Sequence, residues 1–366
     1  MKKHIAVLPG DGIGKEVVAQ AVKVLKAVGD VFDHEFTFEY GLVGAAAIDA
    51  TGDPFPHATE KLCKKSDAIL FGAIGDPKYD NNPKAKIRPE QGLLRMRSEL
   101  GLFANVRPVE SYPILYDQSP LKNELLHGVD FVVFRELTGG IYFGKPSGRS
   151  EDGTQAYDTC LYSKKEITRI AKMAFEAAET RKKKVTMVDK ANVLATSRLW
   201  RETVAEVAKD YPEVELEFMF VDNAAMKIIV QPAYFDVILT ENLFGDILTD
   251  EASVIAGSLG LIPSASLGEK YKLYEPVHGS YPQVAGKDLA NPTAAILSAA
   301  MMLNMSFGAK TESRVIVQAV KDAMDKGYVT QDINKEKYYS TTEVGDAIVS
   351  SIKSDEIVDF EAETII

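Results

Sequence analysis

The strongest constraint on the fold is a regular alternation of short, β-branched apolar runs with longer amphipathic stretches. The run at 4–8 predicts a strand, and apolar residues recurring at three- and four-residue spacing predict a helix over 16–28. Further strands are predicted at 67–71, 130–134, 184–188, 214–221 and 235–240, and helices directly after residue 242, over 292–302 and over 312–325. Such an alternation is typical of an α/β protein.

Size and charge narrow the possible classes. At roughly 150 residues per domain, a chain of 366 residues predicts about two domains. The net charge of −11 argues against a nucleic acid or an anionic membrane as partner. No apolar run approaches the ~18 residues of a membrane helix, and the first residues lead into a strand without a signal-peptide core. Cys63 and Cys160 have neither disulfide-framework nor metal-ligand spacing, so we expect a cytoplasmic protein.

A glycine-rich turn follows the first predicted strand, with Gly10, Gly12 and Gly14 in its sequence. A Rossmann fingerprint needs its third glycine three residues after the second, and Lys15 occupies that position. We therefore predict a tight turn that needs glycine backbone angles, with contact to a cofactor as the alternative.

Acidic residues gather behind the predicted strand at 235–240. Asp246 and Asp250 stand four residues apart, so on a helix their like-charged carboxylates share one face. Carboxylate oxygens suit Mg²⁺ or Mn²⁺, and ligands of α/β sheets collect at the carboxyl ends of strands. Asp222, directly after another predicted strand, is a candidate third ligand. The alternative is a solvated acidic helix face.

Basic residues occupy similar places. Arg97, Arg107 and Arg135 lie at predicted strand or helix ends, where guanidinium forks can clamp a di- or tricarboxylate. Each arginine alone is more often part of a surface ion pair. Lys190 follows the strand at 184–188, and beside a divalent cation its pKa would fall, which makes it a candidate base. The same residue types also suit a Mg²⁺-dependent phosphohydrolase or a non-catalytic dicarboxylate-binding protein.

An ordered set of motifs runs through nearly the whole chain: LPGDGIG at 8–14, RPEQGLL at 88–94, LFANVRP at 102–108, RELTGGIYFG at 135–144, DKANVL at 189–194, the segment 242–258, YEPVHGS at 274–280 and TQD at 330–332. This set resembles the isocitrate/isopropylmalate family of β-decarboxylating dehydrogenases. The resemblance implies a two-domain α/β fold of that family with a large mixed sheet, not a Rossmann fold. It implies a first, cofactor-binding domain of residues 1–102 and 259–366. A second domain, 103–258, would hold the dimerisation surface, the metal and catalytic residues, and a projecting arm near 136–159.

The resemblance also assigns roles to individual residues. Arg97, Arg107 and Arg135 would hold the substrate carboxylates, Leu93 and Leu94 its alkyl group, and Asp222, Asp246 and Asp250 the Mg²⁺ or Mn²⁺, with Asp222 also reaching the substrate. Lys190 would be the base and Tyr142 the proton donor. The cofactor-binding residues would be Glu90, His278, Gly279, Ser280, Gln283, Val284, Asn291 and Asp332. Lys190 and Asp222 would come from the partner subunit of a homodimer.

The implied reaction is the oxidative decarboxylation of (2R,3S)-3-isopropylmalate to 4-methyl-2-oxopentanoate and CO₂ with reduction of NAD, in leucine biosynthesis. Isocitrate, homoisocitrate, tartrate and D-malate are the alternative substrates. Leu93 and Leu94 favour a branched alkyl group, although two leucines on a helix can equally be core. Gln283 stands where the family usually has an aspartate that repels the 2′-phosphate of NADP. No lysine or arginine replaces it, so NAD is favoured.

Overall fold

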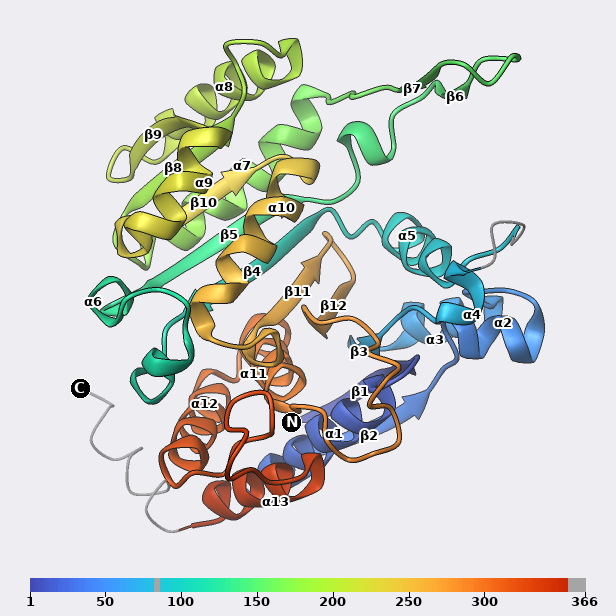
Figure 1. Ribbon diagram of the computed structural model, residues 1–366, viewed down its shortest axis with the longest axis vertical. Helices are drawn as coiled ribbons and strands as arrows, with labels where there is room; N and C mark the ends of the chain where they lie inside the picture. The colour runs from blue at the N-terminus through green and yellow to red at the C-terminus, as the bar shows by residue number, and fades with distance from the viewer. Residues whose placement is uncertain (82–85, 355–366) are drawn as a thin grey trace. The chain divides into compact units, whose positions relative to one another are not determined.

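The computed structural model describes residues 1–81 and 86–354, and the chain divides into two compact units (Figure 1). Unit 1 comprises Met1–Leu100 and Ser258–Ile366, and unit 2 comprises Gly101–Gly257. The expected boundaries, after residues 102 and 258, lie two residues and one residue further along the chain. Each unit is an α/β structure, as the alternation of strand and helix patterns predicts.

Unit 1 is built on a mixed sheet in the order β2-β1-β3-β12-β11, in which β11 alone is antiparallel to its neighbour among the described strands. The strands are β1 (Lys2–Gly10), β2 (Glu35–Tyr40), β3 (Ala68–Ala73), β11 (Pro263–Leu267) and β12 (Lys272–Pro276). The helices are α1 (Gly14–Val31), α2 (Ala45–Thr51), α3 (His57–Lys65), α4 (Pro77–Asp80), α5 (Pro89–Glu99), α11 (Thr293–Phe307), α12 (Lys310–Asp325) and α13 (Thr341–Ile352). Helix α11 is buried along most of its length, because it packs on the sheet and contacts α1 and α12.

Helix α1 illustrates how the sequence dictates this packing. Its buried side includes Val17, Ala21, Val24 and Val28, the three- and four-residue spacing that predicted the helix. Glu16, in the first turn, accepts hydrogen bonds from the backbone N–H groups of 286 and 288, at 3.2 and 2.8 Å. The helix therefore anchors the loop that follows the predicted cofactor motif.

The strands of unit 2 lie in the order β4-β5-β10-β8-β9, with β4 antiparallel to β5 and the other pairs parallel. The strands are β4 (Ala104–Glu110), β5 (Asp130–Glu136), β8 (Lys184–Asp189), β9 (Glu215–Phe220) and β10 (Val237–Thr240). The helices are α6 (Asn123–Leu126), α7 (Lys164–Glu179), α8 (Ala195–Val207), α9 (Val221–Val230) and α10 (Asn242–Ser253). The strands predicted at 130–134, 184–188, 214–221 and 235–240 are confirmed as β5, β8, β9 and β10 within two residues at each end.

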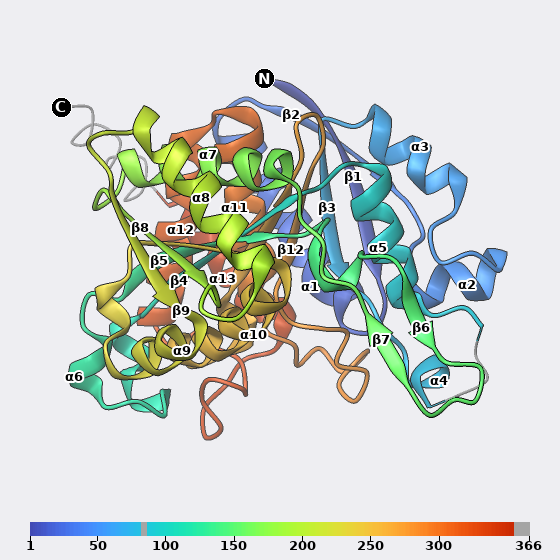
Figure 2. The ribbon, with the colours of Figure 1, turned by 90° about the horizontal axis from the view of Figure 1, so that it is seen from above.

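The segment expected to be an irregular arm contains regular structure. Its strands β6 (Ser147–Arg149) and β7 (Ala156–Asp158) form an antiparallel hairpin that extends away from α7 and α8 of its own unit (Figures 1 and 2). Every residue of both strands is exposed, so the hairpin has no apolar alternation by which the sequence would reveal it.

The register of unit 2 aligns the ends of its parallel strands. Thr240 at the end of β10 pairs with Arg135 on β5 and with Val188 on β8. Residues that leave β5, β8 and β10 therefore emerge at one edge of the sheet, where ligands of α/β proteins bind. None of the described helices combines the length and the apolarity needed to cross a membrane.

Candidate functional site

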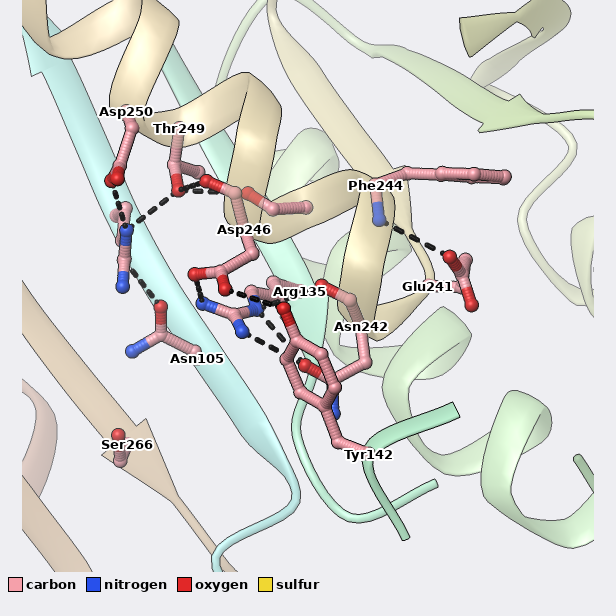
Figure 3. Close-up of polar contacts among 12 residues, drawn as sticks. Asn105, Arg135, Tyr142, Glu241, Asn242, Phe244, Asp246, Thr249, Asp250 and Ser266 are labelled. Carbon is pink, nitrogen blue, oxygen red and sulfur yellow. Dashed lines mark hydrogen bonds and ion pairs between the residues drawn. The ribbon is translucent and has the colours of Figure 1, made fainter. Parts of the chain in front are cut away.

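Arg135 forms the centre of a charged corner at this edge. Its side chain is 4% exposed, and its Nη1 lies 2.5 Å from the Asp246 carboxylate (Figure 3). Its Nε and Nη2 donate to Asn242 Oδ1 at 3.2 and 2.9 Å, and Nε also reaches the Asn242 carbonyl at 3.0 Å. Gly245 permits this approach, because a Cβ there would lie 2.6 Å from Arg135 Cγ. Helix α10 therefore begins against Arg135, the penultimate residue of β5.

Tyr142 completes the corner from the turn after β5. Its hydroxyl donates to Asp246 Oδ2 at 2.8 Å, while the residue remains 45% exposed (Figure 3). Burial of the hydroxyl, together with its bond to the Asp246 carboxylate, raises the pKa of Tyr142 to about 12. The phenol therefore keeps its proton at neutral pH and stands ready as a donor.

Arg107, on β4, holds the next turn of the same helix. Its Nε donates to Asn105 Oδ1 at 2.7 Å, and its Nη1 donates to Thr249 Oγ1 at 2.6 Å and lies 3.5 Å from Asp250. Asp246 and Asp250 thus each face an arginine, which offsets their mutual repulsion. The Asp250 side chain is 71% exposed. Its carboxylate therefore remains accessible to solvent, although it lies beside Arg107 as Asp246 lies beside Arg135.

Lys190 and Asp222 form a separate ion pair in unit 2. The Lys190 ammonium lies 2.5 Å from Asp222 Oδ1, and the side chains are 29% and 62% exposed. The hydrogen bond from Lys190 holds the pKa of the Asp222 carboxyl below its usual range. Among the described residues, no three metal-capable His, Cys, Asp or Glu side chains gather in one group. Within one chain, the expected metal ligands therefore divide into Asp246 with Asp250 on α10, and Asp222 on α9.

Unit 1 contains a pocket of about 330 Å³, which is within the usual range of small-molecule sites. Four of the predicted cofactor residues line it: His278, Gly279, Asn291 and Asp332. The Asn291 amide donates to Asp332 at 3.1 Å, and Ser258 also bonds to that carboxylate. His278 Nδ1 contacts the carbonyl of its neighbour, whereas its buried Nε2 has no partner in the described part of the chain. Burial lowers the pKa of His278, so the imidazole is neutral.

The glycine-rich turn adopts the backbone that the sequence predicts. Gly12 has a φ of +54°, and a Cβ there would lie 1.9 Å from the Ser280 carbonyl, so glycine is required. The next residue, Ile13, donates its N–H to the same carbonyl at 2.8 Å and lines the pocket. The turn therefore shapes the pocket without forming a Rossmann fingerprint.

Other predicted residues of unit 1 lie around this pocket or on α5. Gln283 is exposed and Val284 half-buried in the turn after Ser280, and neither lines the pocket. Glu90 and Ser280 both approach Gly75, because a Cβ on that glycine would lie 3.1 Å from Glu90 Oε1 and 3.5 Å from Ser280 Oγ.

The predicted substrate residues on α5 are Leu93, Leu94 and Arg97. Leu93 is half-buried and Leu94 is 38% exposed, so neither is a core leucine. Arg97 lies 3.4 Å from Glu275, and both side chains are largely covered. The position of Arg97 on this helix leaves Arg107 and Arg135 as the arginines that unit 2 itself brings to α10.

Sequence reasoning missed the uncharged partners of the arginines: Asn105, Asn242 and Thr249. The available signal was the strand order. Asn242 lies just after β10, Arg135 lies near the end of β5, and these two strands are neighbours. Without the strand order, an asparagine at a helix start reads only as a cap.

The amino-acid sequence matches a known protein family. The family model described as isocitrate/isopropylmalate dehydrogenase matches residues 4–348. A 3-isopropylmalate dehydrogenase of Geobacillus kaustophilus is 60% identical over 95% of each chain, and one of Bacillus subtilis is 54% identical over 97% of each.

Solved structures agree with the sequence comparison. An isocitrate dehydrogenase from Methylococcus capsulatus superposes with a TM-score of 0.86 at 35% identity, covering 96% of this chain and 100% of the other. A β-decarboxylating dehydrogenase from Thermococcus kodakarensis, in its apo form, gives a TM-score of 0.81 at 36% identity over 99% and 98%. The predicted fold class and family resemblance are confirmed.

Proposed function

The chain belongs to the isocitrate/isopropylmalate dehydrogenase family, and we propose that it converts (2R,3S)-3-isopropylmalate to 4-methyl-2-oxopentanoate and CO₂ with NAD as oxidant, in leucine biosynthesis. The observation that carries the proposal is the corner in which Arg135, Asp246 and Tyr142 meet, in a chain 60% identical to a protein of that activity. This corner offers a carboxylate-binding cation, metal-binding oxygens and a protonated acid within one small volume.

Substrate recognition follows from the cations and from α5. A guanidinium has five N–H donors in a fixed plane, so Arg107 and Arg135 can bind protein acceptors and a substrate carboxylate together. Arg97 is the third cation of the proposed clamp. Leu93 and Leu94 present apolar surface rather than a further charge, which favours an isopropyl group over the additional carboxylate of isocitrate.

A divalent cation fits the donor set on α10. Asp246 and Asp250 are hard oxygen ligands on successive turns of one helix face, and the Asp250 side chain is largely exposed. We assign Mg²⁺ or Mn²⁺ to these carboxylates, with Asp222 of the partner subunit as third protein ligand. Such a cation, when bound, acidifies a hydroxyl and stabilises developing enolate charge, while NAD accepts the hydride.

The protein's own groups then move the protons. The Lys190 amine takes the proton of the substrate hydroxyl as hydride leaves C2. Tyr142, which holds its proton at neutral pH, donates to C3 after CO₂ has left. Arg107 and Arg135 keep the carboxylates oriented through both steps.

A homodimer explains why Lys190 and Asp222 lie apart from the α10 carboxylates within one chain. Helices α9 and α10 pack together, and they expose large apolar side chains: Met226, Ile229, Val230 and Ile247. Such a surface suits a second copy of the chain. In the symmetric pair each subunit would supply Lys190 and Asp222 to the other's α10.

The pocket of unit 1 fits the adenosine half of NAD. It supplies an asparagine amide, the Asp332 carboxylate and a buried imidazole nitrogen that has no partner among the described residues, the polar groups that a base and ribose require. Glu90 is assigned to the nicotinamide end, and Gln283 to the ribose rim.

Steady-state assays with 3-isopropylmalate, isocitrate and D-malate, each with NAD and NADP and with or without chelator, test the activity. We expect turnover of 3-isopropylmalate with NAD that chelation abolishes. Preference for a substrate without the isopropyl group would instead support a sister dehydrogenase. Phosphate release from esters without a nicotinamide absorbance change would indicate a phosphohydrolase.

Sharing of the sites is tested by mixing two inactive variants, Lys190→Met and Asp246→Asn. Random reassociation makes hybrids with one intact site, so roughly a quarter of wild-type activity should return. Absence of any recovery in proven hybrids would show that each site is built from one chain.

A further inference from the structure

We propose that Asn242 is a positioning residue that ties the Tyr142 turn to Arg135 and thereby fixes the face from which C3 receives its proton. The inference rests on the proposed function, because it concerns the step assigned to Tyr142. Asn242 is 1% exposed, so its side chain does not face solvent.

The side-chain amide of Asn242 is held at both ends. Its Oδ1 accepts from Arg135 Nε and Nη2 (Figure 3), and its Nδ2 donates to the Gly139 carbonyl at 3.2 Å. A guanidinium can only donate and a carbonyl can only accept, so this orientation of the amide is chemically dictated. Asn242 is thus the one side chain in this corner whose bonds, among those described, join the arginine to the backbone of the Tyr142 turn, whereas Asp246 contacts the Tyr142 hydroxyl.

A small number of hydrogen bonds hold the Tyr142 turn in place. The Glu136 carboxylate accepts from the N–H groups of Thr138 and Gly139 at 2.9 and 2.6 Å, which fixes the start of the turn. The Gly139 carbonyl, bonded to Asn242, is the last of these contacts before residues 140–142. Tyr142 lies three residues further, exposed along one side, with its hydroxyl on Asp246. The Gly140 N–H donates to the Leu161 carbonyl at 2.9 Å, so Asn242 and this contact together hold the backbone from which the phenol extends.

Side-chain chemistry leaves few substitutes at position 242. Aspartate keeps an acceptor for Arg135 but turns a second oxygen towards the Gly139 carbonyl, where two acceptors repel. Alanine leaves both the carbonyl and two guanidinium donors without this partner in a buried place, and each unmet group disfavours the native arrangement. Only a primary amide of this length satisfies both neighbours.

The consequence concerns the enolate left after CO₂ departs. Its π electron pair forms the new C3–H bond with the Tyr142 proton, the C2 carbonyl re-forms, and the phenolate recovers a proton from water. A fixed phenol delivers this proton to one face. A phenol that swings with an unanchored turn competes with water, which reaches either face.

The test follows the proton rather than the rate alone. Turnover in D₂O places one deuterium at C3, and an excess of an auxiliary 2-hydroxy-acid dehydrogenase traps the oxo acid before it exchanges. NMR of the C3 methylene then gives the ratio of the two configurations. The proteins compared are wild type, Asn242→Asp, Asn242→Ala, Tyr142→Phe and the control Asn304→Asp, an exposed residue of α11.

We expect one configuration from wild type and from the control, and mixed configurations from both Asn242 variants. Asn242→Asp should keep the substrate KM within about threefold while kcat falls about tenfold or more, because Arg135 keeps its acceptor and the turn does not. A single configuration with unchanged kcat in Asn242→Asp would overturn the inference. A single configuration in Tyr142→Phe would instead remove Tyr142 as donor, which is a failure of the proposed function and is separately visible.

Discussion

The charged corner of unit 2 and the pocket of unit 1 differ in how their side chains are arranged. In the corner, Arg135 is almost fully covered, and its donors meet Asp246 and Asn242. The pocket is walled by apolar side chains, an exposed tyrosine, two glycines, a few short polar side chains and a buried histidine whose pKa burial lowers. Charges that stabilise a transition state must be oriented beforehand, whereas a bound nucleotide needs mainly shape and a few polar contacts. Changes in unit 2 should therefore alter turnover by orders of magnitude, and changes in unit 1 should alter affinity.

The largest effect is expected from Lys190→Met. Removal of the proposed base should lower kcat by about 10²- to 10⁴-fold, whereas Mn²⁺ binding and the melting temperature stay near wild type because the side chain is partly exposed. Activity assays, metal titration and thermal unfolding measure these three properties. Lys209→Met, on the exposed end of the segment after α8, is the control. Retained turnover would remove Lys190 as the base.

Arg135→Lys should be next in size. Lysine keeps the charge but lacks the planar fork that serves Asn242 and Asp246 together, so kcat/KM should fall about 100-fold and stability by about 1–3 kcal/mol. The matched control is Arg181→Lys, whose guanidinium pairs with Asp130, the first residue of β5, and with the buried Asp236 directly before β10. That variant should lose stability while keeping kcat/KM within about twofold. Equal activity losses in both would mean that unfolding, not the site, is being measured.

The charged corner could be predicted from the sequence more fully than the pocket. Apolar runs predict strands β5, β8 and β10, and residue spacing predicts the carboxylates that follow them. Such prediction is possible because burial imposes a regular spacing of apolar residues on the sequence. Asn242 and Asn105 could not be found that way, since their partners come from neighbouring strands and depend on strand order. The pocket is harder still, because its lining joins Ile13, residues 258–260, 278–279, Tyr281, residues 289–291 and Asp332, which no local pattern connects. There, only the ordered motifs of the family resemblance pointed to residues that line the pocket, four of the predicted set.

A smaller effect is expected where unit 1 depends on shape. Gly260→Ala would place a Cβ 2.6 Å from the Cβ of Asn291, a residue of the pocket wall, so KM for NAD should rise about tenfold while kcat at saturation changes little. Gly279→Ala is the matched change, because the added methyl meets no described protein atom within 4 Å. A rise confined to Gly260→Ala identifies displacement of Asn291 as the cause. A kcat loss comparable to that of Arg135→Lys would contradict the division between the two regions.

The smallest effect should come from Gln283→Asp at the exposed rim of the same unit. A carboxylate near the ribose repels the 2′-phosphate of NADP through water, a term of about 1 kcal/mol at close range, so the ratio of kcat/KM for NAD over NADP should rise about fivefold. The rise should shrink as salt is added, because exposed charges are screened. Gln155→Asp, an exposed residue just before strand β7, adds the same charge elsewhere and should leave the ratio unchanged. An unaltered ratio in Gln283→Asp would mean that this position does not face the ribose, and selectivity would then rest on Asp332 inside the pocket.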